Sequence, residues 1–122
     1  MTIQKALQTV DALKHNAYTQ AEKIGWLSCL EHTVKAEILD AFEEGEGKDF
    51  TGYDDTTPLD TVLLVGEPYD RMYLHWLEAQ MDYYNGETLR YNNAMLMFRS
   101  FFDAYAAHYN RTHRAKGQKW KF

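Results

Sequence analysis

The sequence predicts an all-α fold, a four-helix domain with a long antiparallel C-terminal helical hairpin and a long acidic loop. Apolar residues recur at spacings of three and four over four segments, which is the period of an amphipathic helix. Residues 44–60 break that period with three glycines, one proline and six acids. The length of 122 residues suits one domain, which we assign to residues 1–113, with 114–122 as a flexible basic tail.

Two helices are predicted in the N-terminal part of the chain. The first spans 2–14, and Thr19 and Glu22 start the second with a capping box, in which each side chain bonds a free backbone N–H. The second helix is therefore expected from Gln20 to Glu43. The apolar face of the first helix comprises Ile3, Ala6, Leu7, Val10 and Leu13, and that of the second Ile24, Leu27, Leu30, Val34, Ile38, Ala41 and Phe42.

The C-terminal hairpin follows the acidic loop and the apolar run 63–65, which we interpret as extended chain on the core. Pro68 suits the first position of a helix, where its missing N–H is not needed, and Asn85-Gly86 is a left-handed helix stop. The last helix is expected from Glu87 to Arg111. The predicted inner faces contain Tyr69, Met72, Tyr73, Trp76, Leu77, Gln80, Met81 and Tyr84, then Tyr91, Ala94, Met95, Phe98, Phe102, Tyr105 and Tyr109, broadened by Met97, Phe101 and His108.

Charge is distributed unevenly around the net value of −5. Residues 37–70 hold eleven acids and one base, whereas 99–122 hold six bases and one acid. This split argues against a general nucleic-acid binder and could orient identical subunits head to tail. The alternatives are a solvated loop with a loose tail, or an acidic loop that faces a DNA channel. The candidate interface or channel residues among these charges are Asp49, Asp54, Asp55, Asp60, Arg111, Arg114 and Lys116.

Aromatic residues are abundant, at 15% of the chain. Trp76 and Tyr83 lie on the predicted hairpin, and such rings are favoured at the centres of protein interfaces. The same rings would equally fill a small core. We keep both interpretations and add Trp76 and Tyr83 to the candidate interface.

Motifs for catalysis are missing from the sequence. It has no H-E-x-x-H, Cys-x-x-Cys or Glu-x-x-His pattern and no phosphate-binding glycine loop, and His75 with Glu78 is only a lone pair one turn apart. Cys29 is the single cysteine, without a neighbouring base. We therefore expect no enzyme, no metal and no cofactor. No apolar run approaches the roughly 20 residues of a membrane span, and no signal peptide is evident, so we expect no membrane association.

A resemblance extends from about residue 2 to 113. The run LLVGEPYDRMYLHWLEAQMDYYNGETLRYNNAMLMF, with GYDD before it, YNRTH after it and EKIGWLSCLE in the second helix, resembles a family of small prophage proteins of Gram-positive bacteria. These proteins are similar to the head–tail connector or adaptor proteins of tailed phages. Gly66 and His15 stand where such proteins often carry proline.

The resemblance implies a structural virion protein. It would be a neck subunit that assembles into a homo-oligomeric ring at the portal, meets portal and tail-completion proteins, and surrounds double-stranded DNA during packaging without reading its sequence. Its location would be the virion, and the bacterial host cytoplasm during assembly. The alternative is a small prophage-encoded cytoplasmic interaction module or regulator, which would be encoded near lysogeny genes rather than head and tail genes.

Overall fold

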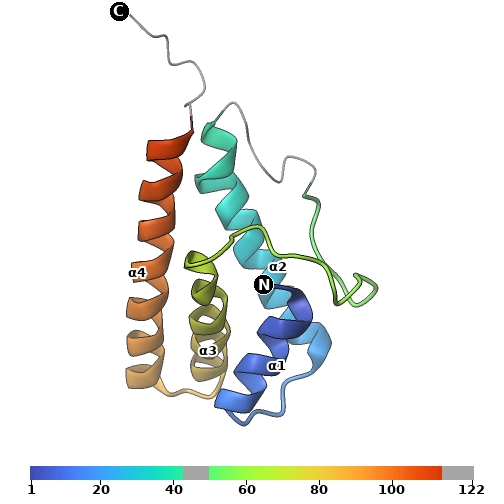
Figure 1. Cartoon of the computed structure of the whole chain (residues 1–122). Helices are drawn as coiled ribbons and strands as arrows, with labels where there is room; N and C mark the ends of the chain where they lie inside the picture. The colour runs from blue at the N-terminus through green and yellow to red at the C-terminus, as the bar shows by residue number, and fades with distance from the viewer. Residues whose placement is uncertain (43–49, 114–122) are drawn as a thin grey trace, which may run out of the picture.

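The computed structural model describes residues 1–42 and 50–113, and these residues form four α-helices (Figure 1). They are α1 (Ile3–Leu13), α2 (Gln20–Glu37), α3 (Met72–Tyr84) and α4 (Thr88–Thr112), with single 3-10 turns η1 (Leu39–Ala41) and η2 (Tyr69–Arg71). An isolated antiparallel bridge joins Thr2 and Val62. The all-α prediction is confirmed. The predicted tail 114–122 and the first residues of the predicted loop lie outside the described residues.

The starts of α1 and α2 follow local capping signals. Thr2 accepts a hydrogen bond from the backbone N–H of Lys5 at 3.1 Å. The predicted capping box is present, with Glu22 N donating to Thr19 Oγ1 at 3.1 Å and Thr19 N to Glu22 Oε1 at 3.4 Å. These bonds satisfy N–H groups that have no partner within the helix, so both helices begin where the sequence predicts.

The end of α2 differs from the prediction, because the helix stops at Glu37 rather than Glu43. The chain tightens into η1, which leaves Ile38, Leu39 and Phe42 buried and Ala41 exposed. On a continuous α-helix Leu39 would point well away from the face of Val34, since successive residues are about 100° apart. The tighter turn brings Leu39 into the core, so the predicted inward position of Ala41 is wrong.

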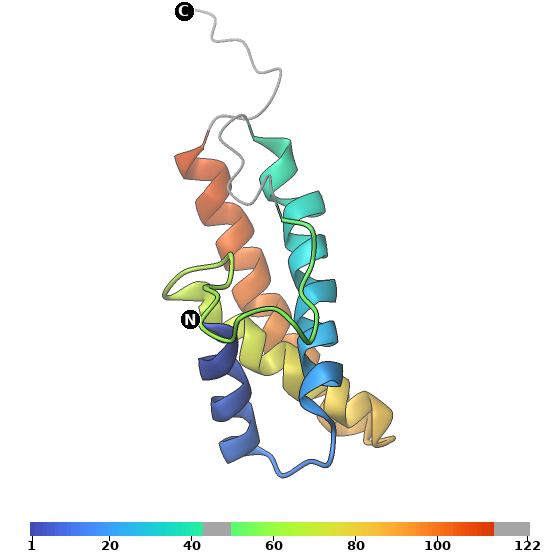
Figure 2. The same ribbon diagram turned by 90° about the vertical axis from the view of Figure 1, so that its right-hand side faces the viewer.

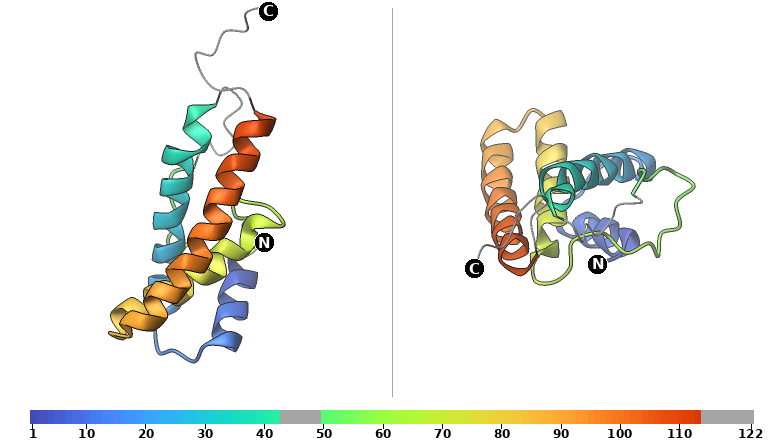
Figure 3. Two further views of the ribbon diagram at one scale, coloured as in Figure 1. Left: turned by 90° about the vertical axis from the view of Figure 1, so that its left-hand side faces the viewer. Right: turned by 90° about the horizontal axis from the view of Figure 1, so that it is seen from above.

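The predicted hairpin of α3 and α4 is confirmed, and α3 is the central helix because it packs against α1, α2 and α4 (Figure 1; Figure 3). Pro68 precedes η2 rather than opening α3 itself, and it follows a cis peptide bond after Glu67. The turn between the helices contains Gly86 at φ +74°, the left-handed conformation that the Asn-Gly pair predicts.

One core connects the four helices with the segment 63–65. Leu63 and Val65 are buried in it, as predicted for extended chain on the core. Leu13, Tyr84 and Met97 are exposed although the apolar spacing places them inward, so these three predictions are wrong. Leu13 and Tyr84 are the last residues of their helices, beyond the packed part of the core. Met97 is half exposed because, among the described elements, α4 packs only against α3 and the short turn η2, which cover a narrow stripe.

Figure 2 shows the chain from residue 50 onward running down beside α2 and across to the start of α1 before it reaches α3. Backbone hydrogen bonds from Ile3 N to Thr61 O and from Leu63 N to Met1 O attach this segment to the start of α1. No helix in the described ranges is both long and apolar enough to cross a membrane.

Candidate interaction surface

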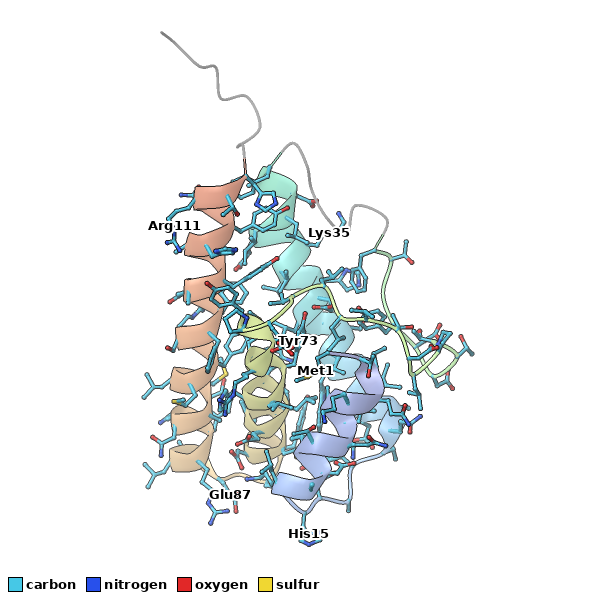
Figure 4. The ribbon with its side chains drawn as sticks, in the orientation of Figure 1. Met1, His15, Lys35, Tyr73, Glu87 and Arg111 are labelled. Carbon is cyan, nitrogen blue, oxygen red and sulfur yellow. The ribbon has the colours of Figure 1, made fainter. Side chains whose placement is uncertain are left out.

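A buried carboxylate holds the segment 50–65 against the helices. Glu31 is 0% exposed in α2, and it accepts hydrogen bonds from the hydroxyls of Tyr53 (2.8 Å) and Tyr73 (2.6 Å) and from the backbone N–H of Leu64 (2.8 Å). Figure 4 shows Tyr73 between α3 and this segment. The Tyr73 hydroxyl also accepts from Val65 N at 2.9 Å. Burial raises the pKa of Glu31, while the three hydrogen bonds act in the opposite direction.

The described part of the acidic loop, residues 50–60, contains three of the four candidate aspartates. Asp54, Asp55 and Asp60 are all exposed, and Asp49 lies outside the described residues. Asp54 shapes the loop, because its Oδ1 accepts hydrogen bonds from the backbone N–H and the hydroxyl of Thr56 at 2.8 and 2.5 Å. These bonds lower the pKa of Asp54, so its negative charge persists to lower pH. Within the described residues, the carboxylates of Asp55 and Asp60 accept no hydrogen bonds of this kind.

Arg111, the basic candidate within the described residues, lies on the other side of the molecule. Arg111 is exposed near the C-terminal end of α4 and projects from its edge (Figure 4). Arg114 and Lys116 lie outside the described residues. Two further arginines of α4, Arg90 and Arg99, are exposed and pair with Glu87 and Asp103 at 3.6 and 3.7 Å. Such exposed pairs are worth little, so both guanidinium groups can serve another partner.

Tyr83 belongs to a series of neighbouring rings at the hairpin end. It contacts the rings of Tyr84 (5.1 Å between centroids) and Tyr91 (5.7 Å), and Tyr84 stacks on Trp26 at 5.7 Å and 11°. Tyr83 and Tyr84 are 62% and 60% exposed. Beside them a groove of about 290 Å³ lies between Tyr83 and Tyr91. The sequence-based choice of Tyr83 as a surface candidate thus corresponds to an exposed aromatic surface.

Trp76 has a different position, half buried between α2 and α4. Its Nε1 donates to the carbonyl of Trp26 at 2.8 Å, and its ring lies 5.2 Å from that of Phe98. These contacts tie α3 to both neighbours. The structure therefore does not bring Trp76 together with Tyr83, and it uses Trp76 within the fold.

An ion pair supports the hairpin end from α1. Lys14, the C-terminal cap of α1, hydrogen-bonds the carboxylate of Asp82, whose side chain is almost completely buried, and lies 3.7 Å from Glu87. The C-terminus of α1 is thereby connected to the turn between α3 and α4. This contact keeps the aromatic surface in a fixed position relative to the N-terminal helices.

The outer face of α4 is apolar at two positions that the sequence analysis missed. Leu89 and Leu96 are 81% and 70% exposed, and they share a face because they are two turns apart. We define the outer face of α4 by its exposed residues Leu89, Asn93, Leu96, Arg99, Ser100, Asp103, Ala104, Ala107 and Arg111. The signal in the sequence was available: two leucines seven residues apart lie opposite the stripe of Ala94, Phe98 and Phe102.

The pair of His75 and Glu78 gains no third ligand. Across residues 1–42 and 50–113 no group of three or more His, Cys, Asp or Glu side chains is placed to hold a metal ion. Burial lowers the pKa of His75, whose ring stacks on Phe101 at 5.7 Å. These contacts place His75 in the packing between α3 and α4.

We compared the chain with protein-family models, curated proteins and solved structures. No protein-family model, no curated protein and no solved structure matches the chain. The exposed aromatic end, the outer face of α4 and the acidic loop are therefore the features from which a function can be argued.

Proposed function

We propose that the chain is a non-enzymatic structural subunit that assembles with copies of itself, of the kind found in phage head–tail connectors. The observation that supports this most is the exposure of five large apolar side chains on one hairpin. They are Tyr83, Tyr84, Leu89, Leu96 and Met97, all within 15 consecutive positions of α3 and α4.

An isolated monomer gains nothing from exposing Leu89 and Leu96, which lie two turns apart on one face of α4. Single exposed apolar residues are normal, but a contiguous apolar patch marks a protein–protein contact. Burying a leucine stabilises by roughly 1.5–3 kcal/mol, so Leu89 and Leu96 alone would contribute about 3–6 kcal/mol to an association that covered them. Side-chain ordering and lost rotational freedom reduce that gain.

The resemblance of the hairpin sequence to prophage connector-like proteins supports a role as a virion protein. A helical subunit with an exposed hairpin face and separated charges meets the needs of a ring, in which each copy contacts two neighbours. The subunit would occupy the neck of the particle, against the portal protein, with DNA passing through the ring.

Electron microscopy of the purified chain with the portal protein of the same genome tests this proposal. We expect rings docked on the portal. A double variant, Leu89→Glu with Leu96→Glu, should lose them while keeping its helical circular dichroism, because both side chains are exposed in the monomer. Gln8→Glu, an exposed change on α1, should leave the rings intact. A stable monomer that ignores the portal at every concentration would refute the proposal and favour a cytoplasmic interaction module.

A further inference from the structure

Opposite charges lie on opposite sides of the molecule. Residues 50–60 carry three acids, Asp54, Asp55 and Asp60, and no base. α4 carries three bases, Arg90, Arg99 and Arg111, and one acid. In Figure 1 and from above in Figure 3, α4 forms one edge of the bundle and the acidic loop projects at the opposite edge. The two surfaces of one copy therefore cannot neutralise each other.

Both surfaces also combine charge with exposed apolar atoms. Leu89 and Leu96 lie on the outer face of α4 beside its arginines, and Val62 is exposed two residues after the acidic loop. A contact between the two surfaces would pair charges of opposite sign around buried apolar side chains, the usual anatomy of an interface.

The described part of the acidic loop is already in a defined conformation, so its docking requires little ordering. The Tyr53 hydroxyl bonds the buried Glu31, and Tyr53 N donates to Ser28 Oγ at 3.0 Å. Asp54 N donates to Thr57 Oγ1 at 2.9 Å, which closes the turn that carries Asp55. Preorganisation of this kind lowers the entropic cost of association.

We propose that the outer face of α4 binds the acidic loop of a second copy of the chain, so that copies join head to tail. The inference rests on the proposed function, since it names the surfaces through which the subunit assembles. Because two different surfaces meet, the contact is heterologous, and it extends from copy to copy until a ring closes. Arg99 and Arg111 would face the aspartates of the neighbour, with Leu96, which lies about one turn from Arg99, covered by the loop.

Charge reversal on one surface at a time tests the inference. The first variant carries Arg99→Glu and Arg111→Glu. The second carries Asp55→Lys and Asp60→Lys and retains Asp54, which holds the turn. In each variant alone, the outer face of α4 and the acidic loop would carry charges of the same sign and repel each other between copies. We therefore expect its self-association to be about 10- to 100-fold weaker than that of the wild type at low salt. Sedimentation velocity measures this, with Lys5→Glu on α1 as the control that should associate normally.

The equimolar mixture of the two variants is the decisive sample. The reversed α4 face of the first variant matches the reversed acidic loop of the second, and the unchanged loop of the first matches the unchanged α4 face of the second. Association should therefore return in the mixture, with the two chains alternating. Wild-type association should weaken with salt. If the wild type associates but the variants associate equally well, or the mixture is no better than its components, the inference is wrong while self-assembly stands.

Two further outcomes are separable. If the variant with Asp55→Lys and Asp60→Lys associates normally but gains binding to double-stranded DNA, the acidic loop belongs to a DNA channel and the inference is overturned. A wild type that remains monomeric, alone and with the portal protein, would refute the proposed function as well.

Discussion

Replacing Glu31 by alanine should destabilise the protein more than any surface change, because one carboxylate organises three parts of the chain. Glu31 lies in α2, and its hydrogen-bond donors come from the acidic loop (Tyr53), the extended segment (Leu64) and α3 (Tyr73). The alanine variant leaves these donors without their acceptor. The Tyr73 hydroxyl is fully buried, so water cannot replace the carboxylate there.

The magnitude follows from the three donors. A buried polar group left unsatisfied costs about 1–3 kcal/mol, and the partly exposed Tyr53 recovers some of that from water. We expect Glu31→Ala to lower the free energy of unfolding by about 3–5 kcal/mol. In a domain of this size each kcal/mol changes Tm by about 3–5 °C, so Tm should fall by about 10–20 °C. Urea and thermal denaturation followed by far-UV circular dichroism measure both quantities. A loss below about 1 kcal/mol would refute the reasoning.

The conservative variant Glu31→Gln separates charge from hydrogen bonding. It retains an acceptor oxygen and the volume, and we expect a loss of about 1–2 kcal/mol. Because burial raises the pKa of Glu31 above its ordinary value, the folded state binds this proton more tightly than the unfolded state. The contribution of Glu31 to stability is therefore full below the unfolded pKa, near 4.5, and is lost as pH rises through the folded pKa. The cost of Glu31→Gln should be larger at pH 4 than at pH 7; a cost that grows with pH would contradict the raised pKa.

Two further predictions concern other parts of the fold. Lys14→Ala removes the partner of the buried Asp82 and should lower the free energy of unfolding by about 3–5 kcal/mol in urea denaturation. The control Arg90→Ala removes an exposed pair with Glu87 and should lower it by under about 1 kcal/mol. Equal losses would show that the Lys14 pair is as weak as a surface pair. Gly52→Ala should lower the free energy of unfolding by about 1–3 kcal/mol, because Gly52 has φ +118° and an added Cβ would lie 3.3 Å from side-chain atoms of His32 and Ser28. The control Gly66→Ala places its Cβ in open space and should change that free energy by less than about 1 kcal/mol. An unchanged Tm of Gly52→Ala in thermal melts would exclude strain at that turn.

The sequence predicts those parts of the fold that depend on local signals. The capping box of Thr19 and Glu22 and the Asn85-Gly86 stop need no tertiary contact, so both are found where they are expected. The end of α2 is different, since it depends on Leu39 turning into a core that other elements complete. Apolar periodicity likewise does not reveal how many neighbours a helix has, and Met97 was misplaced for that reason.

The candidate surface was predicted only in part. The charge runs identify Asp54, Asp55, Asp60 and Arg111, and Tyr83 is exposed as an interface residue must be. Trp76 could not be separated from Tyr83 by sequence, because its hydrogen bond to Trp26 joins helices distant in the chain. Glu31 was missed although a signal existed: it lies four residues after Leu27 and three before Val34, on the apolar face of α2.

The hydrogen bonds that reach from segment 63–65 into the core have a consequence for motion. Leu64 N–H and Val65 N–H belong to no helix or strand, yet they donate to Glu31 and to Tyr73, which are completely buried. Amide hydrogens in irregular segments usually exchange quickly with solvent, because local fraying opens them. Here exchange requires the carboxylate and the phenol to separate, which disrupts α2 and α3 as well. These two amides should therefore exchange as slowly as those of the central helix, and the irregular segment and the helices open together as one cooperative unit.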